Sequence, residues 1–327
     1  MLNAHNSLPR VPDREHDWAL VLAGGEGKRL QQLTRTDGGP VPKQFCSLAG
    51  GPSLLQEAMH RAQTVVCAKR TCAVVTARHR AWWGSQLESL PRENVVVQAK
   101  ALGTAMGILG SLLMILRRDP QANLLVLPSD HFVKDEAPLT AAMSRALTLS
   151  REGAGQLILL GIAPDEADSE FGYVVPTAAP AAALRGVSEF IEKPDGVAAR
   201  AAIARGAVWN SFIFAVRGRV LLDLFAQVAP DLVAELTTST LSADAVAARL
   251  DQAPHMDFSS DVLQRCADRL RVLTVPACGW SDLGTPRRLA CVLRDRECRA
   301  RARAVNRPTP FVNLAHQLQL HHGRAAL

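Results

Sequence analysis

ALVLAGGEGKRLQQLTRTDGGPVPKQF occupies residues 19–45, where an apolar run leads directly into glycine-rich chain followed by cations. Glycine lets bare backbone N–H groups approach a ligand closely, and the cations favour an anion. The stretch lacks the Gly-Lys-Ser/Thr ending of a P-loop and the glycine spacing of a dinucleotide-binding loop. It therefore predicts a strand that ends in a loop around a polyphosphate, with a plain glycine turn as the alternative.

Outward from this stretch, apolar runs alternate with helical patterns through the first half of the chain. This alternation predicts an α/β fold with a doubly wound, mainly parallel sheet that helices cover on both faces. Ligands of such sheets bind off the carboxyl ends of the strands, which gives weight to Gly24, Gln98 and Asp130. We expect strands at 18–23, 71–76, 94–98, 123–127 and 156–161, and helices at 53–66, 78–89, 104–118 and 139–151.

The second half contains shorter β-runs, at 173–176, 184–191, 208–216 and 271–275. We interpret them as a substrate-side β elaboration of the same domain. The organisation that follows is a flexible N-terminal tail at 1–16, one domain at 17–290 and a basic C-terminal tail or helix at 291–327.

Composition excludes several classes of protein. The 327 residues are 48% hydrophobic and 21% charged, which is ordinary globular usage. Residues 1–17 have no apolar core of a signal peptide and no run reaches the ~20 residues of a membrane span, so we expect a cytoplasmic protein without a membrane partner. The seven scattered cysteines are interpreted as small buried hydrophobes.

The net charge of +6 is concentrated, because eight arginines lie between residues 287 and 307. Aromatic residues that could stack on bases are missing from this segment. We therefore interpret it as a solvated helix face and expect no nucleic-acid partner.

Charged residues at strand ends are the candidates for chemistry. Arg29 offers a planar donor to a phosphate, and Lys43, fixed by Pro42 before it, offers a point charge. Asp130 follows a buried strand and Asp282 lies in a second motif, so the two could hold Mg²⁺, although either could instead cap a helix. His131 is interpreted as a structural histidine rather than a general base.

Glu192 and Lys193 end a strand before Pro194, with an acid suited to sugar hydroxyls and a cation suited to a phosphate. A surface ion pair is the alternative for this pair.

In this order, the segments LAGGEGKRL, PKQF, LPSDH, FGY, FIEKP, WNSFIF and WSDLGT resemble the sugar-phosphate nucleotidyltransferase family over about residues 18–286. PKQF and PSDH are most similar to the bacterial mannose-1-phosphate guanylyltransferases. The resemblance implies an enzyme in which a sugar 1-phosphate attacks the α-phosphorus of a nucleoside triphosphate, with Mg²⁺ as cofactor. The implied substrates are GTP and mannose 1-phosphate, and the implied product, GDP-mannose, serves polysaccharide biosynthesis; a homo-oligomer is left open.

The resemblance also implies roles for particular residues. Arg29 and Lys43 would hold the leaving pyrophosphate, Lys193 the sugar phosphate, and Asp130 and Asp282 the metal. The nucleotide would contact Leu22, Ala23, Gly24, Gly25, Gly27, Lys28, Gln98 and Gly103, and the sugar would contact Gly172, Glu192, Asn210 and Phe212.

Four features depart from the family pattern: Lys28 in place of threonine, a small insertion at 36–39, Leu102 in place of a polar residue, and Phe212 in place of glycine. Leu102 removes a possible nucleotide contact. Phe212 either narrows the sugar pocket or packs its ring into the core. Two alternatives remain at this point. One is a glucose-1-phosphate thymidylyl- or uridylyltransferase, and the other is a non-catalytic relative that binds a nucleotide sugar.

Overall fold

The computed structural model describes residues 14–27, 34–36, 39–48, 50–153, 155–178, 183–238 and 241–294. Where a range is expected from sequence, the strand or helix lies within a few residues of it, because long apolar runs and capping residues mark these elements. From sequence, no range is expected for the strands at 35–36 and 39–40 or for the helices after residue 152. The strands are β1 (Asp17–Leu22), β2 (Arg35–Thr36), β3 (Gly39–Pro40), β4 (Thr71–Thr76), β5 (Val95–Gln98), β6 (Asn123–Pro128), β7 (Leu157–Ile162), β8 (Gly172–Pro176), β9 (Leu184–Glu192), β10 (Val208–Arg217) and β11 (Leu270–Thr274).

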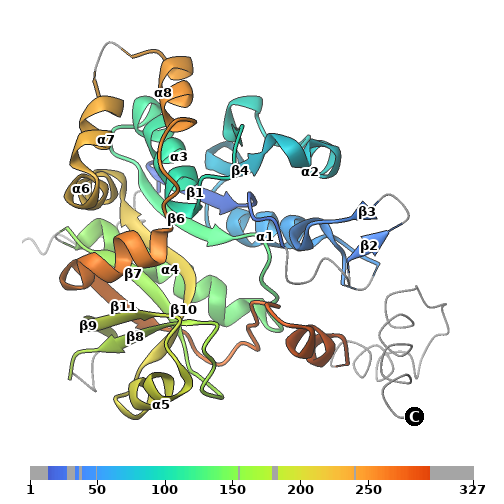
Figure 1. Cartoon of the computed structure of the whole chain (residues 1–327), viewed down its shortest axis with the longest axis vertical. Helices are drawn as coiled ribbons and strands as arrows, with labels where there is room; N and C mark the ends of the chain where they lie inside the picture. Colours follow the sequence, from blue (N-terminus) through green and yellow to red (C-terminus); the bar gives the residue numbers. More distant parts are fainter. Residues whose placement is uncertain are drawn as a thin grey trace, which may run out of the picture.

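Among the described residues, eight α-helices, α1 to α8, can be followed in Figure 1, in addition to a helical run at 286–294. Several begin at a residue whose side chain caps the first turn, as Ser53 does for α1 and Asp195 for α5. The helices are α1 (Leu54–Gln63), α2 (Arg80–Gln86), α3 (Thr104–Arg118), α4 (Glu136–Glu152), α5 (Gly196–Ala204), α6 (Gly218–Val228), α7 (Pro230–Leu236) and α8 (Ala243–Leu250).

One nine-stranded sheet runs through the molecule in the order β5-β4-β1-β6-β10-β7-β11-β9-β8. β5, β4, β1 and β6 are parallel, as the strand–helix alternation predicts. The rest of the sheet is mixed, since β10 is antiparallel to β6 and β7, and β9 is antiparallel to β11 and β8. The expectation of a mainly parallel sheet is therefore wrong for the second half, where short connections such as that between β8 and β9 produce antiparallel pairs.

Both faces of the sheet are covered, and alternate side chains of β1 pack into the core on each face. Trp18 and Leu20 pack into one core with α3 and α6, whereas Ala19 and Val21 pack into another core with α1 and α4. Successive side chains of a strand point to opposite faces. A strand buried on both faces must therefore be apolar throughout, as residues 18–22 are.

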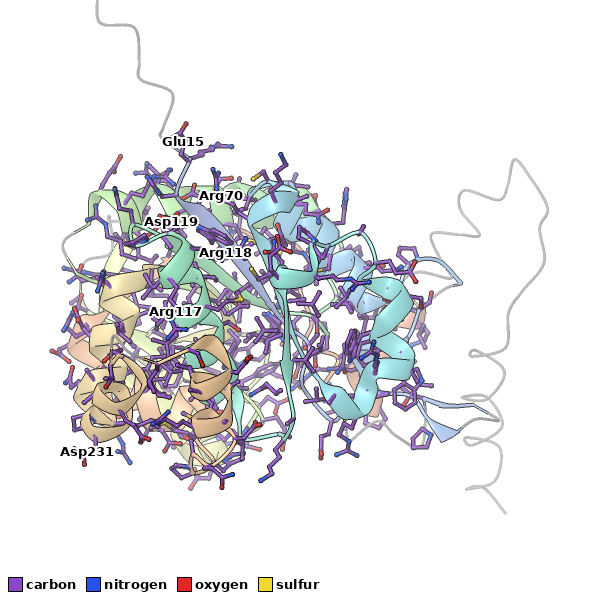
Figure 2. All side chains as sticks on the ribbon, turned by 90° about the horizontal axis from the view of Figure 1, so that it is seen from above. Glu15, Arg70, Arg117, Arg118, Asp119 and Asp231 are labelled. Atoms are coloured by element: carbon purple, nitrogen blue, oxygen red, sulfur yellow. The ribbon has the colours of Figure 1, made fainter. Side chains whose placement is uncertain are left out.

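The amino end of β1 is closed by side chains, of which Arg118 and Asp119 are labelled in Figure 2. Trp18 Nε1 donates to Asp119 at 2.8 Å, and the Arg118 guanidinium lies 4.8 Å from the centroid of the Trp18 ring. Asp17, which is buried, pairs with Arg151 and accepts a hydrogen bond from Asn123 at 2.9 Å. The carboxyl ends of the parallel strands lie at the opposite edge of the sheet, which these side chains do not close.

At the C-terminal side, residues 286–294 are helical, and Leu289, Val292 and Leu293 pack on Leu54 at the start of α1. The expected tail at 1–16 and the segment at 291–327 lie mostly outside the described residues, so those boundaries stay predictions.

Among the described residues, no helix is long and apolar enough to cross a membrane. The interpretation of the cysteines needs correction. Cys72, Cys266 and Cys278 are buried, but Cys46 is only partly buried, and Cys67 and Cys291 are exposed.

Candidate active site

The glycine-rich loop follows β1 and is held by hydrogen bonds from the PKQF segment. Gln44, which is buried, donates through Nε2 to the carbonyl oxygens of Ala23 at 3.1 Å and Gly25 at 2.7 Å. Gly27 has a φ of +61°, and a Cβ there would lie 3.0 Å from the Lys43 backbone nitrogen. Glycine is therefore required at 27 both for its backbone conformation and for the close approach of PKQF.

The same segment brings Lys43 against the two aspartates. Lys43 Nζ lies 3.0 Å from Asp130 Oδ2 and donates to the backbone carbonyl of Asp282 at 2.5 Å. A backbone bridge between Phe132 and Ser281, with hydrogen bonds of 2.8 and 2.9 Å, holds the two motifs together. Residues separated by more than 150 positions in sequence therefore surround one ammonium group.

This arrangement sets the charge of Asp130. Burial raises the pKa of its carboxyl, but the Lys43 ammonium, His131 and the hydrogen bonds to the carboxyl together hold the pKa below its ordinary value. Neither aspartate caps a described helix, since α4 is capped by Asp135 and the Asp282 side chain accepts from the Gly284 N–H. The helix-cap alternative is thus wrong for both residues.

A carboxylate oxygen of Asp130 and the backbone carbonyl oxygen of Asp282 both contact the Lys43 ammonium. The Asp282 carboxylate is bound by Arg288. Oxygen atoms of this kind are the ligands that a hard divalent metal prefers. No group of three or more His, Cys, Asp or Glu side chains in the described ranges could hold a metal by itself. A metal bound here would need further oxygen ligands from water or a phosphate. The residues fit Mg²⁺ in this sense, because it commonly keeps only one or two protein carboxylates.

His131 is held by its neighbours and also lines the cavity beside Asp130. Its Nδ1 accepts a hydrogen bond from Trp280 Nε1 at 3.2 Å, and the two rings meet edge to face with centroids 5.0 Å apart. Burial lowers the pKa of His131 to about 3. The imidazole is therefore neutral near pH 7, and Nδ1 is already engaged, as expected for a residue that supports the strand end.

A cavity of about 580 Å³ opens beside the glycine loop at the carboxyl ends of β1, β5 and β6. Ligand sites of open α/β sheets lie at this edge. Gln98 lines this cavity and lies close to two glycines. A Cβ atom at Gly24 would lie 3.3 Å from Gln98 Oε1, and one at Gly107 would lie 3.1 Å from it. Of the predicted site residues, the cavity is lined by Leu22, Gly24, Gly25, Gln98, Gly103, Asp130 and Phe212.

The predicted sugar-side residues form a second group that adjoins this cavity. Gly172 pairs with Glu192 across β8 and β9, and a Cβ at Gly172 would lie 2.6 Å from Glu192 Oε2 and 3.5 Å from the Asn210 Cβ. Burial raises the pKa of Glu192, and the Lys193 ammonium, 3.4 Å from Oε1, opposes that shift. The ion pair between Glu192 and Lys193 considered from sequence is thus present, with the Lys193 side chain half exposed.

Phe212 connects the two groups. β10 has a bulge between Asn210 and Phe214, where the Phe212 N–H bonds to Asn210 Oδ1 at 3.0 Å and Phe212 takes a φ of +58°. Left-handed backbone favours glycine, which explains why a phenylalanine here is a departure. The ring lines the cavity and also lies 6.1 Å from the Phe258 ring, so it serves both the site and the core.

Several predicted residues are not placed at the cavity. Lys28 and Arg29 lie outside the described residues, as does part of the insertion at 36–39. Leu102 lines a different cavity, between β5, α3 and α8, while its carbonyl accepts from the Met256 N–H at 3.0 Å. Its replacement of a polar residue therefore does not remove a lining group from the 580 Å³ cavity.

Sequence reasoning missed some lining residues. His255 reaches the cavity from a segment whose Met256 carbonyl accepts from the Ala105 N–H at 3.1 Å. Thr104 and Gly107 line it from α3, and no charge or glycine pattern marked any of these three. Gln44 could have been found, since it lies inside the quoted PKQF.

Comparison with known proteins shows which family this chain resembles. A family model described as Nucleotidyl transferase matches residues 18–297. The chain is 31% identical over 284 residues to mannose-1-phosphate guanylyltransferase from Escherichia coli K12, covering 82% of this chain and 58% of that protein. It is 32% identical over 276 residues to the xanthan biosynthesis protein XanB from Xanthomonas campestris pv. campestris B100, covering 81% and 57%.

Among solved structures, mannose-1-phosphate geranyltransferase from Thermus thermophilus matches with a TM-score of 0.70 and 28% identity, over 82% of this chain and 76% of that one. UDP-glucose pyrophosphorylase in complex with UDP-glucose shares the fold, with a TM-score of 0.59 and 14% identity over 86% of this chain and 99% of that one. The chain spans under two thirds of the length of the curated relatives it matches. With a family model that covers most of its length, this chain belongs to the Nucleotidyl transferase family.

Proposed function

We propose that this chain transfers a guanylyl group from GTP to mannose 1-phosphate, giving GDP-mannose and pyrophosphate. The observation that carries the proposal is the convergence of Lys43, Asp130 and Asp282 beside the glycine-loop cavity. Cations and hard oxygen ligands next to exposed backbone N–H groups suit a polyphosphate rather than an acyl or glycosyl substrate.

The reaction needs no general base. A sugar phosphate has a second pKa near ~6, so its attacking oxygen is already an anion at pH 7. The work of the protein is then to offset repulsion between two anions and to align them for in-line attack. A neutral His131 whose Nδ1 is already hydrogen-bonded is consistent with this chemistry.

In the proposed arrangement, the glycine loop and Gln98 hold the nucleotide, and Lys43 with Arg29 holds the departing pyrophosphate. Glu192 and Asn210 hold the sugar, and Lys193 its phosphate. Asp130 and Asp282 would hold Mg²⁺, which supplies positive charge to the phosphate oxygens. Lys43 must then exchange part of its contact with Asp130 for a phosphate oxygen.

Guanine and mannose are proposed because the Escherichia coli relative is a mannose-1-phosphate guanylyltransferase. The XanB relative is a xanthan biosynthesis protein, so we propose that the nucleotide sugar made here also serves polysaccharide synthesis. The matched part of this chain corresponds to 58% of the Escherichia coli protein, and the proposed function refers to this chain alone.

Pyrophosphate release from a panel of substrate pairs tests the proposal. GTP, ATP, CTP, UTP and dTTP are each combined with mannose 1-phosphate and glucose 1-phosphate, with Mg²⁺ present and absent. We expect the highest kcat/KM for GTP with mannose 1-phosphate, and none without the metal. A preference for dTTP or UTP with glucose 1-phosphate would overturn the substrate assignment, and nucleotide-sugar binding without turnover of any pair would overturn the activity.

A further inference from the structure

The guanidinium of Arg288 bridges two carboxylates beside the proposed metal residues. Arg288 belongs to the helical run at 286–294, and its Nη1 donates to Asp282 Oδ1 at 2.8 Å. Its Nη2 donates to Oδ2 of Asp168, in the segment before β8. All three side chains are largely buried, with 13% of Arg288 exposed. The bridge therefore joins the helical run at 286–294 to the sugar-side half of the sheet.

Arg288 is fixed by more than its two ion pairs. Its guanidinium carbon lies 4.1 Å from the centroid of the Phe171 ring. Asp168 is itself fixed, because its Oδ1 accepts from the Glu170 N–H at 2.8 Å and its backbone carbonyl accepts from the Tyr173 hydroxyl at 2.9 Å. A side chain held at three points acts as a rigid support rather than a mobile cation.

The bridge also restricts Asp282. Its Oδ1 accepts a second hydrogen bond, from the Gly284 N–H at 3.0 Å. On the other side of the carboxylate, a Cβ at residue 284 would lie 2.3 Å from Oδ2. Rotation of the carboxylate would break both bonds to Oδ1, so its plane is set by Arg288 and by the lack of a side chain at Gly284.

We propose that Arg288 is a positioning residue that holds the Asp282 carboxylate in the orientation required by a divalent metal. Through Asp168 and Phe171 it also ties Asp282 to the residue before Gly172, on the sugar side. The role of Asp282 as a metal ligand rests on the proposed function; the bridge itself does not. Because a planar fork makes the bridge, a lysine, which is a point charge, cannot replace it.

The test replaces Arg288 by lysine, which keeps the positive charge near Asp282 and removes the fork. Binding of Mn²⁺ to the full chain is followed by electron paramagnetic resonance without substrates. We expect Arg288→Lys to weaken Mn²⁺ binding about tenfold, the usual size of such supporting contacts, and to raise the Mg²⁺ concentration for half-maximal turnover. Arg287→Lys is the matched control, since Arg287 is exposed and pairs with Glu166 on the surface at 3.1 Å.

Asp168→Asn is a second variant, which leaves Arg288 and Asp282 in place and weakens the far anchor. We expect Asp168→Asn also to weaken Mn²⁺ binding, but by less than Arg288→Lys. If thermal melting shows that Arg288→Lys is poorly folded, the Mn²⁺ affinity of Asp168→Asn tests the proposed role of Arg288 instead. Wild-type Mn²⁺ affinity in both folded variants, or no Mn²⁺ binding to the wild type, would overturn the proposal. The titration involves no turnover, so a chain that uses no substrate pair would defeat the proposed function without deciding the role of Arg288.

Discussion

The two ends of the parallel strands both contain a buried or partly buried aspartate paired with a cation, yet the surroundings differ. At the amino end, Asp17 pairs with Arg151 and accepts from Asn123, whose amide oxygen in turn accepts from Ser150 at 2.6 Å. At the carboxyl end, Asp130 lines a cavity and pairs with Lys43. A charge whose partners are all protein groups contributes to stability, whereas one that faces a cavity is available to a ligand.

The largest expected effect is on turnover at the carboxyl end. Asp130→Asn and Asp282→Asn should each lower kcat by on the order of 1000-fold, since each removes charge that would hold the metal on the transferring phosphate. Steady-state kinetics at saturating Mg²⁺ measure this, and circular dichroism checks folding. Near-normal turnover in either folded variant would remove that aspartate from the site.

At the amino ends of the strands we expect a substitution to lower stability and to leave turnover unchanged. Asp17→Asn leaves the Arg151 guanidinium without its buried counter-charge, which typically costs about 3 kcal/mol. Urea denaturation should show that loss in the free energy of unfolding, with kcat unchanged at a temperature where the variant is folded. If Asp17→Asn instead lowered kcat in the folded enzyme, the division between a structural and a functional end would fail.

Two lysines sharpen the description of the functional end. Lys43→Met should lower kcat/KM for the triphosphate about 100-fold, because a buried ammonium next to Asp130 is lost. Lys193→Met should mainly raise KM for the sugar phosphate, about tenfold, since this side chain is half exposed and solvent screens it. Initial rates with each substrate varied separately distinguish the two, and identical defects would contradict the assigned roles.

Phe212 lies between the cavity and the core, and its substitution tests whether the ring affects sugar selection. Phe212→Gly relieves a left-handed phenylalanine but removes a ring from contact with Phe214 and Phe258. We expect disfavoured sugar 1-phosphates to be used about tenfold better, the usual size of exclusion by an apolar group, with nucleotide preference unchanged. The substrate panel measures this. An unchanged sugar profile in a stable variant would make the ring a core residue alone.

The smallest expected effect is a difference in pH dependence. Burial raises the pKa of Asp119, but hydrogen bonds from Trp18 and His16 outweigh it and lower that pKa, so its contribution to stability exists above about pH 3.8 and is lost as pH falls. Burial raises the pKa of Glu192, so its contribution exists below about pH 4.5 and is lost as pH rises.

Unfolding free energies between pH 3 and 7 test this pair. The advantage of the wild type over Asp119→Asn should shrink toward low pH, and its advantage over Glu192→Gln should shrink toward high pH. Parallel trends in the two comparisons would contradict the assigned causes.

Local sequence patterns predicted most elements of the fold. α3 and β4 match their expected ranges, because each is a long periodic or β-branched segment whose own residues favour one conformation. The pairing directions in the second half were not predictable, since the antiparallel insertion of β10 between β6 and β7 depends on contacts between segments about 50 to 90 positions apart.

The sequence by itself also determined which chemistry is present: glycines that expose backbone N–H groups, lysines and aspartates at strand ends, and the order of the family motifs. Only the tertiary structure decided how these groups meet. Lys43 lies between Asp130 and Asp282, and Arg288 bridges Asp282 to Asp168. The physical reason is that conformational preference acts over a few residues, whereas charge pairing and burial act between whichever residues the sheet brings together.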